Sequence, residues 1–390
     1  METYKLSDLC EILDAKRKPL SALQRAKKQG IYPYYGAQGI IDHLDEYLLD
    51  GEYLLVAEDG ANLETRNQPI ANIAKGKIWV NNHAHVLGSN GKCPLNLLGF
   101  ILNNMNISPY VTGCAQPKLN QENLRNIEIE LPSHIDSIAS ILSSLDRKIE
   151  LNNKINADLE EMAQAIFKNW FVDFEPFKDG KFVDSELGMI PEGWKVVTLD
   201  ELTSKFGTGL NPRKNFVLGH GNNYYVTIKN MGNNRIYLND RCDKVDDEAL
   251  AKINERSKLQ KGDLLFSGIG TIGRVAMVVD DPVNWNTSES VFNMHPIDTI
   301  SSEFIYLLLL SDIFQQYVQQ NAQGGVQQGI RMASLKAFRL AIPDDLKAFD
   351  NLVKPIIAKV KNNDKENDSL SLLRDTLLPR LMSGEIEVHK

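Results

Sequence analysis

The chain has 390 residues, of which 43% are hydrophobic and 24% charged, a composition that indicates about two folded domains and excludes an intrinsically disordered protein. Its net charge of −8 is unusual for a protein that binds nucleic acid, so any such binding should depend on local basic patches or on a partner that supplies charge. The four cysteines stand singly, and we identify neither a signal peptide nor a membrane-spanning apolar run, which predicts a cytoplasmic protein with reduced thiols and no zinc site.

Residues 1–133 are predicted to form a first mixed α/β unit. Strand-like stretches cover 53–56 and 78–80, a helix is predicted over 97–103, and a polar loop leads to a last strand that ends at Pro132. Residues 16–28 include six Lys and Arg side chains, Lys16, Arg17, Lys18, Arg25, Lys27 and Lys28. This segment is either a phosphate-binding patch or an ordinary solvated basic face.

Residues 134–172 are predicted to form a long amphipathic helix. Apolar residues recur at steps of three and four, which is the spacing of a coiled-coil seam. The seam positions are Ile138, Leu142, Leu145, Ile149, Ile155, Leu159, Met162, Ile166 and Trp170. A lone helix of this kind needs a partner to bury its apolar side.

The second half of the chain repeats the first at an offset of 211 residues. Gly51 corresponds to Gly262 and Pro132 to Pro343, each within a similar run of neighbours. Residues 173–344 are therefore predicted to hold a linker and a second mixed α/β unit, with strands over 264–266 and 275–279 and a helix over 303–319. Residues 345–390 complete the repeat with a second long helix and a tail.

The second helix carries the seam of the first, at Phe349, Val353, Ile356, Val360, Leu370, Leu373, Leu377 and Leu381. Both seams become polar in the middle, at 152–153 and 362–363, while Pro355 and Pro379 are expected to kink the second helix or mark its ends. The predicted fold is α+β: two mixed α/β units separated by two long antiparallel coiled-coil helices, in a pseudo-twofold internal duplication. The alternative is two separate surface helices, each packed on its own unit.

Two motifs that suggest an enzyme are better explained by structural roles, and a third, of adenine methyltransferases, is absent. Residues 268–273 fit G-x-G-x-x-G but precede a predicted strand, not the helix that would hold a pyrophosphate. Asp344 and Asp345 are adjacent at a helix start, where Asp344 is an N-cap candidate, whereas two metal ligands would have to come from separate segments. The chain also has no Pro-Pro pair, so it lacks the loop with which adenine methyltransferases grip a flipped base.

Several segments of the chain, in order, resemble specificity (S) subunits of type I restriction–modification systems. Residues 145–152, 159–164 and 167–174 are similar to the central conserved region of that family, and residues 188–194 to the segment that follows it. Residues 373–386 resemble the C-terminal conserved region, and Trp79–Leu87 resembles a motif of the recognition domains.

This resemblance implies a non-catalytic DNA-binding role. Each mixed α/β unit would be a target recognition domain that reads one half of a bipartite, asymmetric DNA site, and the helices would space the two halves. The helices would also dock two methyltransferase (M) subunits, which carry S-adenosylmethionine, while restriction (R) subunits that use ATP and magnesium would join that core. The docking positions that it implies are Ile149, Leu159, Met162, Ile166, Trp170, Leu370, Leu373 and Leu377.

Polar residues at corresponding places in the two units are the candidates for DNA contact. Gln can bond adenine bidentately in the major groove, and Lys or Arg can hold phosphate or guanine. The candidates are Asn81, His83, His85, Gln116 and Lys118 in the first unit and Asn286, Ser288, Ser290, Gln327 and Arg331 in the second. Asn286, Ser288 and Ser290 are the predicted counterparts of Asn81, His83 and His85, and Gln116 and Gln327 share a position because the loop 113–118 corresponds to 324–329. The alternative for each is that it only shapes its loop; for His83 and His85, a metal site lacks a third ligand nearby in sequence.

A competing hypothesis is a duplicated scaffold that binds two protein partners through its helices and no DNA. The same duplication and the same helices would serve it. It does not explain why two polar loop sets with different side chains are placed on a symmetric frame. Neighbouring genes for an adenine methyltransferase and a helicase-nuclease would favour the DNA-binding hypothesis.

Overall fold

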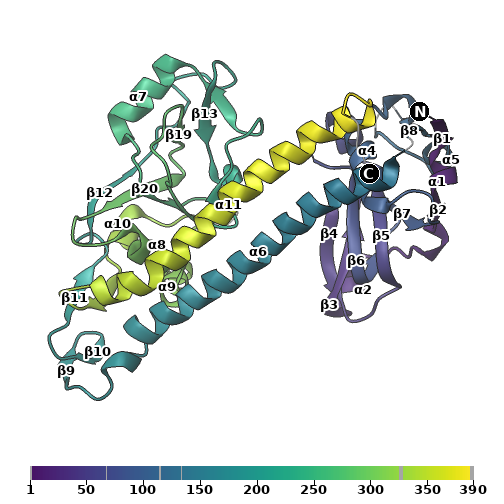
Figure 1. Cartoon of the computed structure of the whole chain (residues 1–390). Helices are drawn as coiled ribbons and strands as arrows, with labels where there is room; N and C mark the ends of the chain where they lie inside the picture. The colour runs from purple at the N-terminus through teal and green to yellow at the C-terminus, as the bar shows by residue number, and fades with distance from the viewer. Residues whose placement is uncertain (1, 67, 114–115, 133, 325–327, 387–390) are drawn as a thin grey trace. The chain divides into compact units, whose positions relative to one another are not determined.

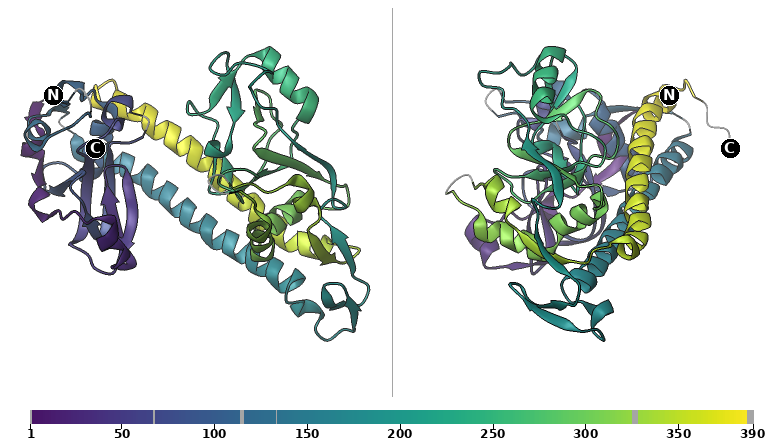
Figure 2. Two further views of the ribbon diagram at one scale, coloured as in Figure 1. Left: turned by 180° about the vertical axis from the view of Figure 1, so that it is seen from behind. Right: turned by 90° about the vertical axis from the view of Figure 1, so that its left-hand side faces the viewer.

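The computed structural model describes residues 2–66, 68–113, 116–132, 134–324 and 328–386. The chain divides into two compact units: unit 1 comprises Met1–Leu151 and Glu366–Lys390, and unit 2 comprises Asn152–Lys365. Two long helices, α6 (Ile135–Phe171) and α11 (Lys347–Met382), each contribute one part to unit 1 and one part to unit 2. Both are unbroken ribbons, α6 in teal and α11 in yellow (Figures 1 and 2).

Unit 1 is built around one mixed sheet. Six strands of its described residues pair in the order β2-β7-β5-β6-β3-β4, antiparallel except for β3 and β6. These strands are β2 (Cys10–Ile12), β3 (Gln29–Gly36), β4 (Gly39–Leu44), β5 (Leu49–Ala57), β6 (Ala71–Val80) and β7 (Ala84–Ser89). The other elements are β1 (Glu2–Lys5), paired with β8 (Glu128–Leu131), and the helices α1 (Leu6–Leu9), α2 (Ala22–Ala26), α3 (Asn62–Thr65), α4 (Leu95–Asn104) and α5 (Gln121–Arg125).

The core of unit 1 joins the sheet to both long helices. Helix α4 packs against β5, β6 and β7, because its apolar residues, including Leu97 and Leu98, have no exposed surface. The same apolar cluster includes Leu142 from α6 and Leu378 and Leu381 from α11. Burial of several leucines, each worth about 1.5–3 kcal/mol, therefore attaches this part of each long helix to unit 1.

Unit 2 repeats this plan with a more divided sheet. Within its described residues, one sheet has the order β12-β20-β17-β18 and another the order β16-β13-β19, in which β13 and β19 are parallel. Their strands are β12 (Thr203–Thr208), β13 (Asn223–Val226), β16 (Asp243–Val245), β17 (Leu264–Ser267), β18 (Val275–Met277), β19 (Trp285–Thr287) and β20 (Val291–Pro296).

The remaining elements of unit 2 are short pairs of strands and helices. The strand pairs are β9 (Phe182–Ser185) with β10 (Gly188–Pro191), β11 (Lys195–Thr198) with β21 (Arg339–Ile342), and β14 (Met231–Gly232) with β15 (Arg235–Ile236). The helices are α7 (Asp247–Ser257), α8 (Ser302–Leu310), α9 (Asp312–Asn321) and α10 (Met332–Lys336). No helix in the described part of the chain combines the length and the hydropathy needed to cross a membrane.

Aromatic side chains hold the long helices in unit 2. Phe171 of α6 lies edge-on to Phe349 of α11, with ring centroids 4.8 Å apart, and both contact Phe304 of α8. Edge-to-face pairs at this separation contribute beyond their burial alone. The end of α6 and the start of α11 are therefore fixed to the same core.

Polar side chains are buried where α6 and α11 meet farther along in unit 2. The Asn156 amide donates to the Asp364 carboxylate at 3.0 Å, and the Asn363 amide donates to the Asn156 side-chain oxygen at 2.8 Å. Asn156 and Asn363 are only 8% and 1% exposed. Because the end of α6 contacts the start of α11 while Asn156 contacts later residues, the two helices are antiparallel within unit 2.

A buried charged group also joins these helices to the rest of unit 2. The Lys361 ammonium lies 4.9 Å from the centroid of the Tyr306 ring, and Asn234 donates to the Glu160 carboxylate at 3.2 Å. Burial lowers the pKa of Lys361 and raises the pKa of Glu160, although the nearby opposite charge of each favours the ionised form of the other.

The predicted elements are largely confirmed, with three corrections. The helix predicted over 303–319 is two helices, because Ser311 interrupts it and its hydroxyl caps α9 by accepting from the Phe314 amide at 3.4 Å. Pro355 and Pro379 lie inside α11 and do not mark its ends; both are exposed, on the solvent side of the helix. Asp344 is not the cap of α11, since Asp345 accepts from the Lys347 amide instead, at 2.8 Å.

The predicted seam of α6 also needs correction in unit 2. The residues buried there are Asn152, Asn156, Ala163, Phe167 and Phe171, whereas Ile155, Leu159 and Ile166 are half-buried and Met162 is 51% exposed. The pattern of aliphatic residues therefore marked a neighbouring stripe of the helix. Likewise, Asn153 and Asn362 of the predicted polar centre are exposed, whereas Asn152 and Asn363 are buried.

Candidate nucleic-acid interface

Three polar segments of unit 1 come together at one end of its sheet. The Glu58 amide, just after β5, donates to the His83 carbonyl at 2.9 Å, and the Leu119 amide donates to the Glu58 carbonyl at 2.8 Å. Thr112 and Lys118 exchange two backbone hydrogen bonds at 2.8 and 2.7 Å. These bonds define the unit 1 loop cluster, which comprises 58–60, 81–83 and the described parts of 112–118.

Unit 2 builds the same cluster with the same backbone bonds. The Gly268 amide donates to the Ser290 carbonyl at 2.9 Å, and the Ile330 amide donates to the Gly268 carbonyl at 2.9 Å. Gln323 and Gly329 exchange two backbone bonds at 2.8 Å. The unit 2 loop cluster therefore comprises 268–270, 288–290 and the described parts of 323–329.

The matching bonds establish which residues correspond between the units. The Asn81 amide donates to the Tyr35 carbonyl at 3.0 Å, and the equivalent bond in unit 2 joins Ser288 to Val226 at 2.8 Å. Val56 pairs with His85 across β5 and β7, as Phe266 pairs with Phe292 across β17 and β20.

Asn81 therefore corresponds to Ser288, His83 to Ser290 and His85 to Phe292. This corrects the predicted correspondence with Asn286, Ser288 and Ser290 by two residues. The sequence comparison matches the two segments at their asparagines, Asn81 and Asn286. The backbone bonds and the strand pairing instead match Asn81 with Ser288.

The structure separates the predicted DNA-contact residues by their exposure. The exposed residues are His83, Gln116, Lys118 and Arg331, and Ser290 is half-buried. The buried residues are Asn81, His85, Asn286 and Ser288, none of them more than 4% exposed. Gln327 lies outside the described residues.

Each buried candidate has a structural environment that accounts for it. The Asn81 side chain accepts from the His83 amide at 2.7 Å, and the Asn286 amide donates to Asn254 at 2.7 Å and to the Ser257 carbonyl at 3.0 Å. Ser288, within the unit 2 loop cluster, is 4% exposed, and its hydroxyl has no hydrogen-bond partner among the described residues. Side chains buried in this way do not reach the surface, so the prediction of DNA contact remains for the exposed and half-buried residues and for Gln327.

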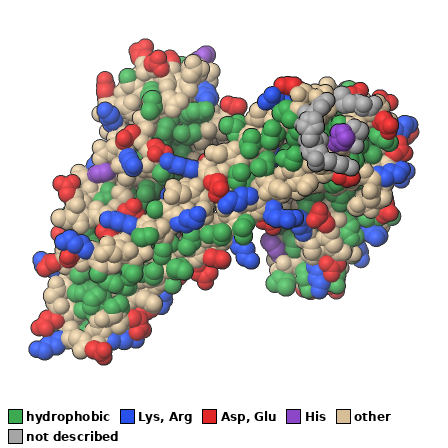
Figure 3. All heavy atoms as spheres, in the orientation of Figure 1, with side chains coloured by type: hydrophobic (Ala, Val, Ile, Leu, Met, Phe, Trp, Pro, Cys, Tyr) green, Lys and Arg blue, Asp and Glu red, His purple; other side chains and the backbone are tan. Residues whose placement is uncertain are grey.

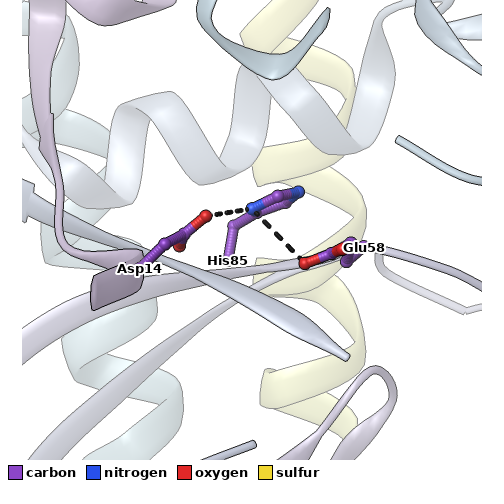
Figure 4. Close-up of side chains that lie close together, drawn as sticks. All are labelled: Asp14, Glu58 and His85. Carbon is purple, nitrogen blue, oxygen red and sulfur yellow. Dashed lines mark hydrogen bonds and ion pairs between the residues drawn. The ribbon is translucent and has the colours of Figure 1, made fainter. Parts of the chain in front are cut away.

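His85 belongs to a charged network beneath the unit 1 loop cluster (Figure 4). Its Nδ1 lies 2.6 Å from the Asp14 carboxylate and its Nε2 lies 2.7 Å from the Leu119 carbonyl. The Arg17 guanidinium bridges the carboxylates of Asp14 and Glu58, at 3.2 and 2.5 Å, and the Lys118 ammonium lies 3.2 Å from Glu58. The network therefore connects the interior of the sheet to an exposed lysine of the loop cluster.

The charges of this network compensate one another. Burial alone would raise the pKa of Asp14 and of Glu58, but hydrogen bonds and positive charge from His85, Arg17 and Lys118 outweigh it, so both pKa values lie below their ordinary range. The two ring nitrogens of His85 face the Asp14 carboxylate and the Leu119 carbonyl, which places the ring between the interior of the sheet and the loop cluster.

The same network has the donor spacing of a metal site. One ligand atom each from Asp14, Glu58 and His85 lies within 4.8 Å of the others. The Arg17 guanidinium already contacts both carboxylates, so the protein itself supplies the positive charge at this place.

Arg17, Asp14 and Glu58 were not singled out as site residues by sequence reasoning. Arg17 lies in the basic segment 16–28, for which the sequence predicts either a phosphate-binding patch or a solvated basic face. In the structure, Arg17 binds two carboxylates, Arg25 binds Asp42 at 2.8 Å and Lys28 binds Glu46 at 2.6 Å. Much of the positive charge in this segment is therefore neutralised within unit 1.

The predicted docking residues lie beside the buried seam of the helices. Ile149, Leu159, Ile166, Trp170, Leu370 and Leu377 are half-buried, and Met162 and Leu373 are 51% and 45% exposed. Within unit 2, Ile155, Leu159, Met162 and Ile166 follow one another at steps of three and four and form the α6 stripe. Hydrophobic side chains gather over this half of α6 and the start of α11 in Figure 3. Trp170 is instead part of the core, against Phe177 and Phe349.

Comparisons with known proteins agree on one family. A family model for the type I restriction modification DNA specificity domain matches residues 1–161 and 191–373. The type I restriction enzyme MjaIX specificity subunit of Methanocaldococcus jannaschii is 29% identical over 287 residues, which cover 71% of this chain and 65% of that protein. The HindI specificity subunit of Haemophilus influenzae is 25% identical over 335 residues, which cover 69% of this chain and 71% of that protein.

A solved structure has the same fold. The crystal structure of a type I restriction-modification system S subunit from M. genitalium matches with a TM-score of 0.54 and 15% sequence identity. The match covers 100% of this chain and 96% of that one. The fold is thus shared with a protein of very different sequence.

Proposed function

This chain belongs to the family of type I restriction–modification specificity subunits, and we propose that it is the non-catalytic DNA-reading subunit of such a complex. Units 1 and 2 are target recognition domains, and each reads one half of a bipartite, asymmetric DNA site. The alternative, a scaffold that binds only proteins, shares the helices but gives no role to the loop clusters.

One observation carries this proposal: the two loop clusters share a backbone and differ in side chains. The bonds of Glu58 and Gly268 to the neighbouring segments are the same, so each cluster presents its loops on the same frame. Lys118 of unit 1 corresponds to Gly329 of unit 2, and His83 to Ser290. A common frame with different polar groups suits two domains that read different base sequences.

We assign the DNA contacts to the exposed members of the predicted set. Gln116 is the candidate for direct base readout, because its amide can pair bidentately with adenine. Lys118 and Arg331 are the candidates for phosphate or guanine. His83, which is exposed, and Ser290, which is half-buried, lie at equivalent places in the two clusters and are the remaining candidates.

The helices serve two further roles in this proposal. As an antiparallel coiled coil, α6 and α11 hold the two recognition domains at a fixed separation and so set the spacing of the half-sites. The α6 stripe, whose Met162 is 51% exposed, docks a methyltransferase subunit. A partly exposed apolar row at helical spacing suits packing against a helix of a partner.

The proposed partners carry the chemistry that this chain lacks. Two methyltransferase subunits bring S-adenosylmethionine and methylate adenine, and restriction subunits bring ATP and magnesium. The net charge of −8 opposes binding of the free chain to a polyanion, so specific affinity should depend on the methyltransferase partner.

A binding titration tests this dependence. The purified chain, with and without its proposed adenine methyltransferase partner, is titrated with duplex carrying the genomic methylation motif at one stated salt concentration. We expect the complex to bind at least about tenfold more tightly than the chain alone. Met162→Glu should remove this gain in affinity, because it places a charge in the α6 stripe. Val283→Glu, at a surface position that is 88% exposed, should not remove it. Equal sequence-specific affinity with and without the partner contradicts the proposal.

A further inference from the structure

The charged network of unit 1 has no counterpart in unit 2. Glu58 corresponds to Gly268 and His85 to Phe292, as the backbone bonds and strand pairing of the two units show. A Cβ atom at Gly268 would lie only 2.4 Å from the Phe292 ring. In unit 2, the phenylalanine ring therefore fills the volume that the Glu58 side chain occupies in unit 1.

The replacement of Glu58 and His85 by Gly268 and Phe292 leaves the loop backbone unchanged but changes which side chains the loop exposes. Gly268 and Glu58 make the same backbone bonds, so the Glu58 side chain is not needed to form the frame. Its carboxylate instead reaches Lys118, whose ammonium lies 3.2 Å away and whose side chain is 51% exposed. The equivalent of Lys118 in unit 2 is Gly329, which has no side chain to hold.

We infer that Glu58 is a positioning residue that aims the Lys118 ammonium at DNA in the half-site read by unit 1. The DNA part of this inference rests on the proposed function. An unrestrained lysine side chain loses rotamer freedom when it binds, so a lysine already held in one direction binds phosphate at a smaller entropic cost.

The rest of the network fixes the direction of Glu58. The Arg17 guanidinium forms ion pairs with the Glu58 carboxylate at 2.5 Å and with the Asp14 carboxylate at 3.2 Å. His85 holds Asp14 on one side and the Leu119 carbonyl, the residue after Lys118, on the other. The buried His85 imidazole thus orients the Glu58 carboxylate, through Asp14 and Arg17, and also the backbone next to Lys118.

A double-mutant cycle in the complex with the methyltransferase tests the inference. The variants are Glu58→Gln, Lys118→Gln and the double variant, with duplex carrying the genomic methylation motif as the probe. We expect Glu58→Gln to weaken binding by roughly threefold to tenfold in the wild-type background, and by less than about twofold when Lys118 is already replaced. Glu52→Gln is the matched control, since Glu52 pairs with Lys75 on the same sheet at 3.7 Å.

Two results of this cycle overturn the inference. A rise in affinity on Glu58→Gln would show that the carboxylate repels DNA or restrains Lys118. An equal loss of affinity in both backgrounds would show that Glu58 acts by general stability and not through Lys118.

The mobility of the Lys118 side chain provides an arm that does not depend on DNA. In Glu58→Gln, we expect NMR relaxation to show a more mobile Lys118 side chain and an unchanged Lys75 side chain, because Glu58 contacts Lys118 whereas Glu52 contacts Lys75. An unchanged Lys118 side chain overturns the inference even if DNA binding falls. If the wild-type complex itself fails to bind the duplex, the proposed function is wrong, and the relaxation result still decides whether Glu58 holds the Lys118 side chain.

Discussion

Asp14 is the buried carboxylate through which the unit 1 network meets the interior of the sheet. Its carboxylate accepts from the backbone N–H of Val86 at 2.9 Å and from the side-chain amide of Gln121 at 3.2 Å, besides its contact with His85. Burial acts to raise its pKa, but these hydrogen bonds and the charges of His85 and Arg17 lower it below its ordinary value of 3.8. The folded state therefore favours the charged form of Asp14 more than the unfolded state does.

This difference in pKa predicts a pH dependence of stability. This stabilisation is fully present above the pKa of Asp14 in the unfolded state, which is about 4. It is lost as the pH falls through the lower pKa that Asp14 has in the folded state. The pKa of Glu58 shifts in the same direction, and so adds to the effect. In urea unfolding between about pH 6 and pH 3, we expect Asp14→Asn to be less stable at the upper end and to depend less steeply on pH.

Asp50→Asn is the control for this prediction, because Asp50 is exposed on β5 of the same unit. It should retain the pH dependence of the wild type. A slope that is unchanged in Asp14→Asn would mean that the network does not contribute to the stability of the folded state.

At the scale of residues, the sequence predicted polarity correctly but not exposure. Asn81, His85 and Asn286 are polar residues of the kind that contact bases, yet each is buried and hydrogen-bonded inside its unit. Burial of these side chains depends on partners far along the chain, such as Asp14 for His85 and Asn254 for Asn286. A local motif carries no information about such partners.

At the scale of elements, the buried asparagines of the long helices have a testable role. Asn156 donates to Asp364 and accepts from Asn363, so all three side chains are paired within unit 2. Asn156→Ala would leave both partners short of one hydrogen bond in a buried place, at a cost of about 1–3 kcal/mol. We expect this loss in the free energy of unfolding measured with urea.

Asn169→Ala provides the matched control, since Asn169 is exposed on the same helix. It should change the free energy of unfolding by less than about 0.5 kcal/mol. If Asn156→Ala is as stable as the wild type, the asparagines do not fix the pairing of α6 with α11 in unit 2.

The long helices were predictable because their apolar residues recur over many turns. The range predicted for α6 differs from the observed Ile135–Phe171 by one residue at each end. The face that is buried was less predictable, because Asn152, Asn156 and Ala163 take the buried positions in unit 2 while Ile155, Leu159 and Ile166 flank them. Hydropathy alone ranks isoleucine and leucine above asparagine, so it selected the neighbouring stripe.

At the scale of the whole molecule, the helices are proposed to act as a ruler. Four residues inserted after Asn153 and four after Asp364, its equivalent in the repeat, would lengthen both helices by about 6 Å, close to two base-pair steps of about 3.4 Å. Each insertion adds about one helical turn, so the buried faces stay roughly in phase. Asn156, Asn363 and Asp364 also stay together on one side of the insertions.

We therefore expect the lengthened chain to recognise the same two half-sites with one or two more base pairs between them. Replacing the same number of residues at these points, without insertion, is the control for local disruption. A change in the half-sites at constant spacing would show that the helices do not set the gap.

The duplication itself was the part of the architecture that the sequence predicted best. The offset of 211 residues between Gly51 and Gly262 persists to Pro132 and Pro343, so it identified two related units and two related helices. Inside the loop clusters, the predicted correspondence of Gln116 with Gln327 agrees with the backbone bonds of the flanking residues, whereas that of Asn81 was wrong by two residues. Backbone bonds and strand pairing, which the local sequence does not reveal, establish the second correspondence.

The central claim, that this chain reads a bipartite DNA site, is tested most directly by sequencing adenine methylation in a genome that carries the chain and its methyltransferase partner. Methylation is compared between cells with the intact gene and cells in which only this gene is deleted. We predict a split, asymmetric motif with one methylated adenine in each half, and its disappearance on deletion. A single continuous palindrome, or a motif that persists without this chain, would contradict the account.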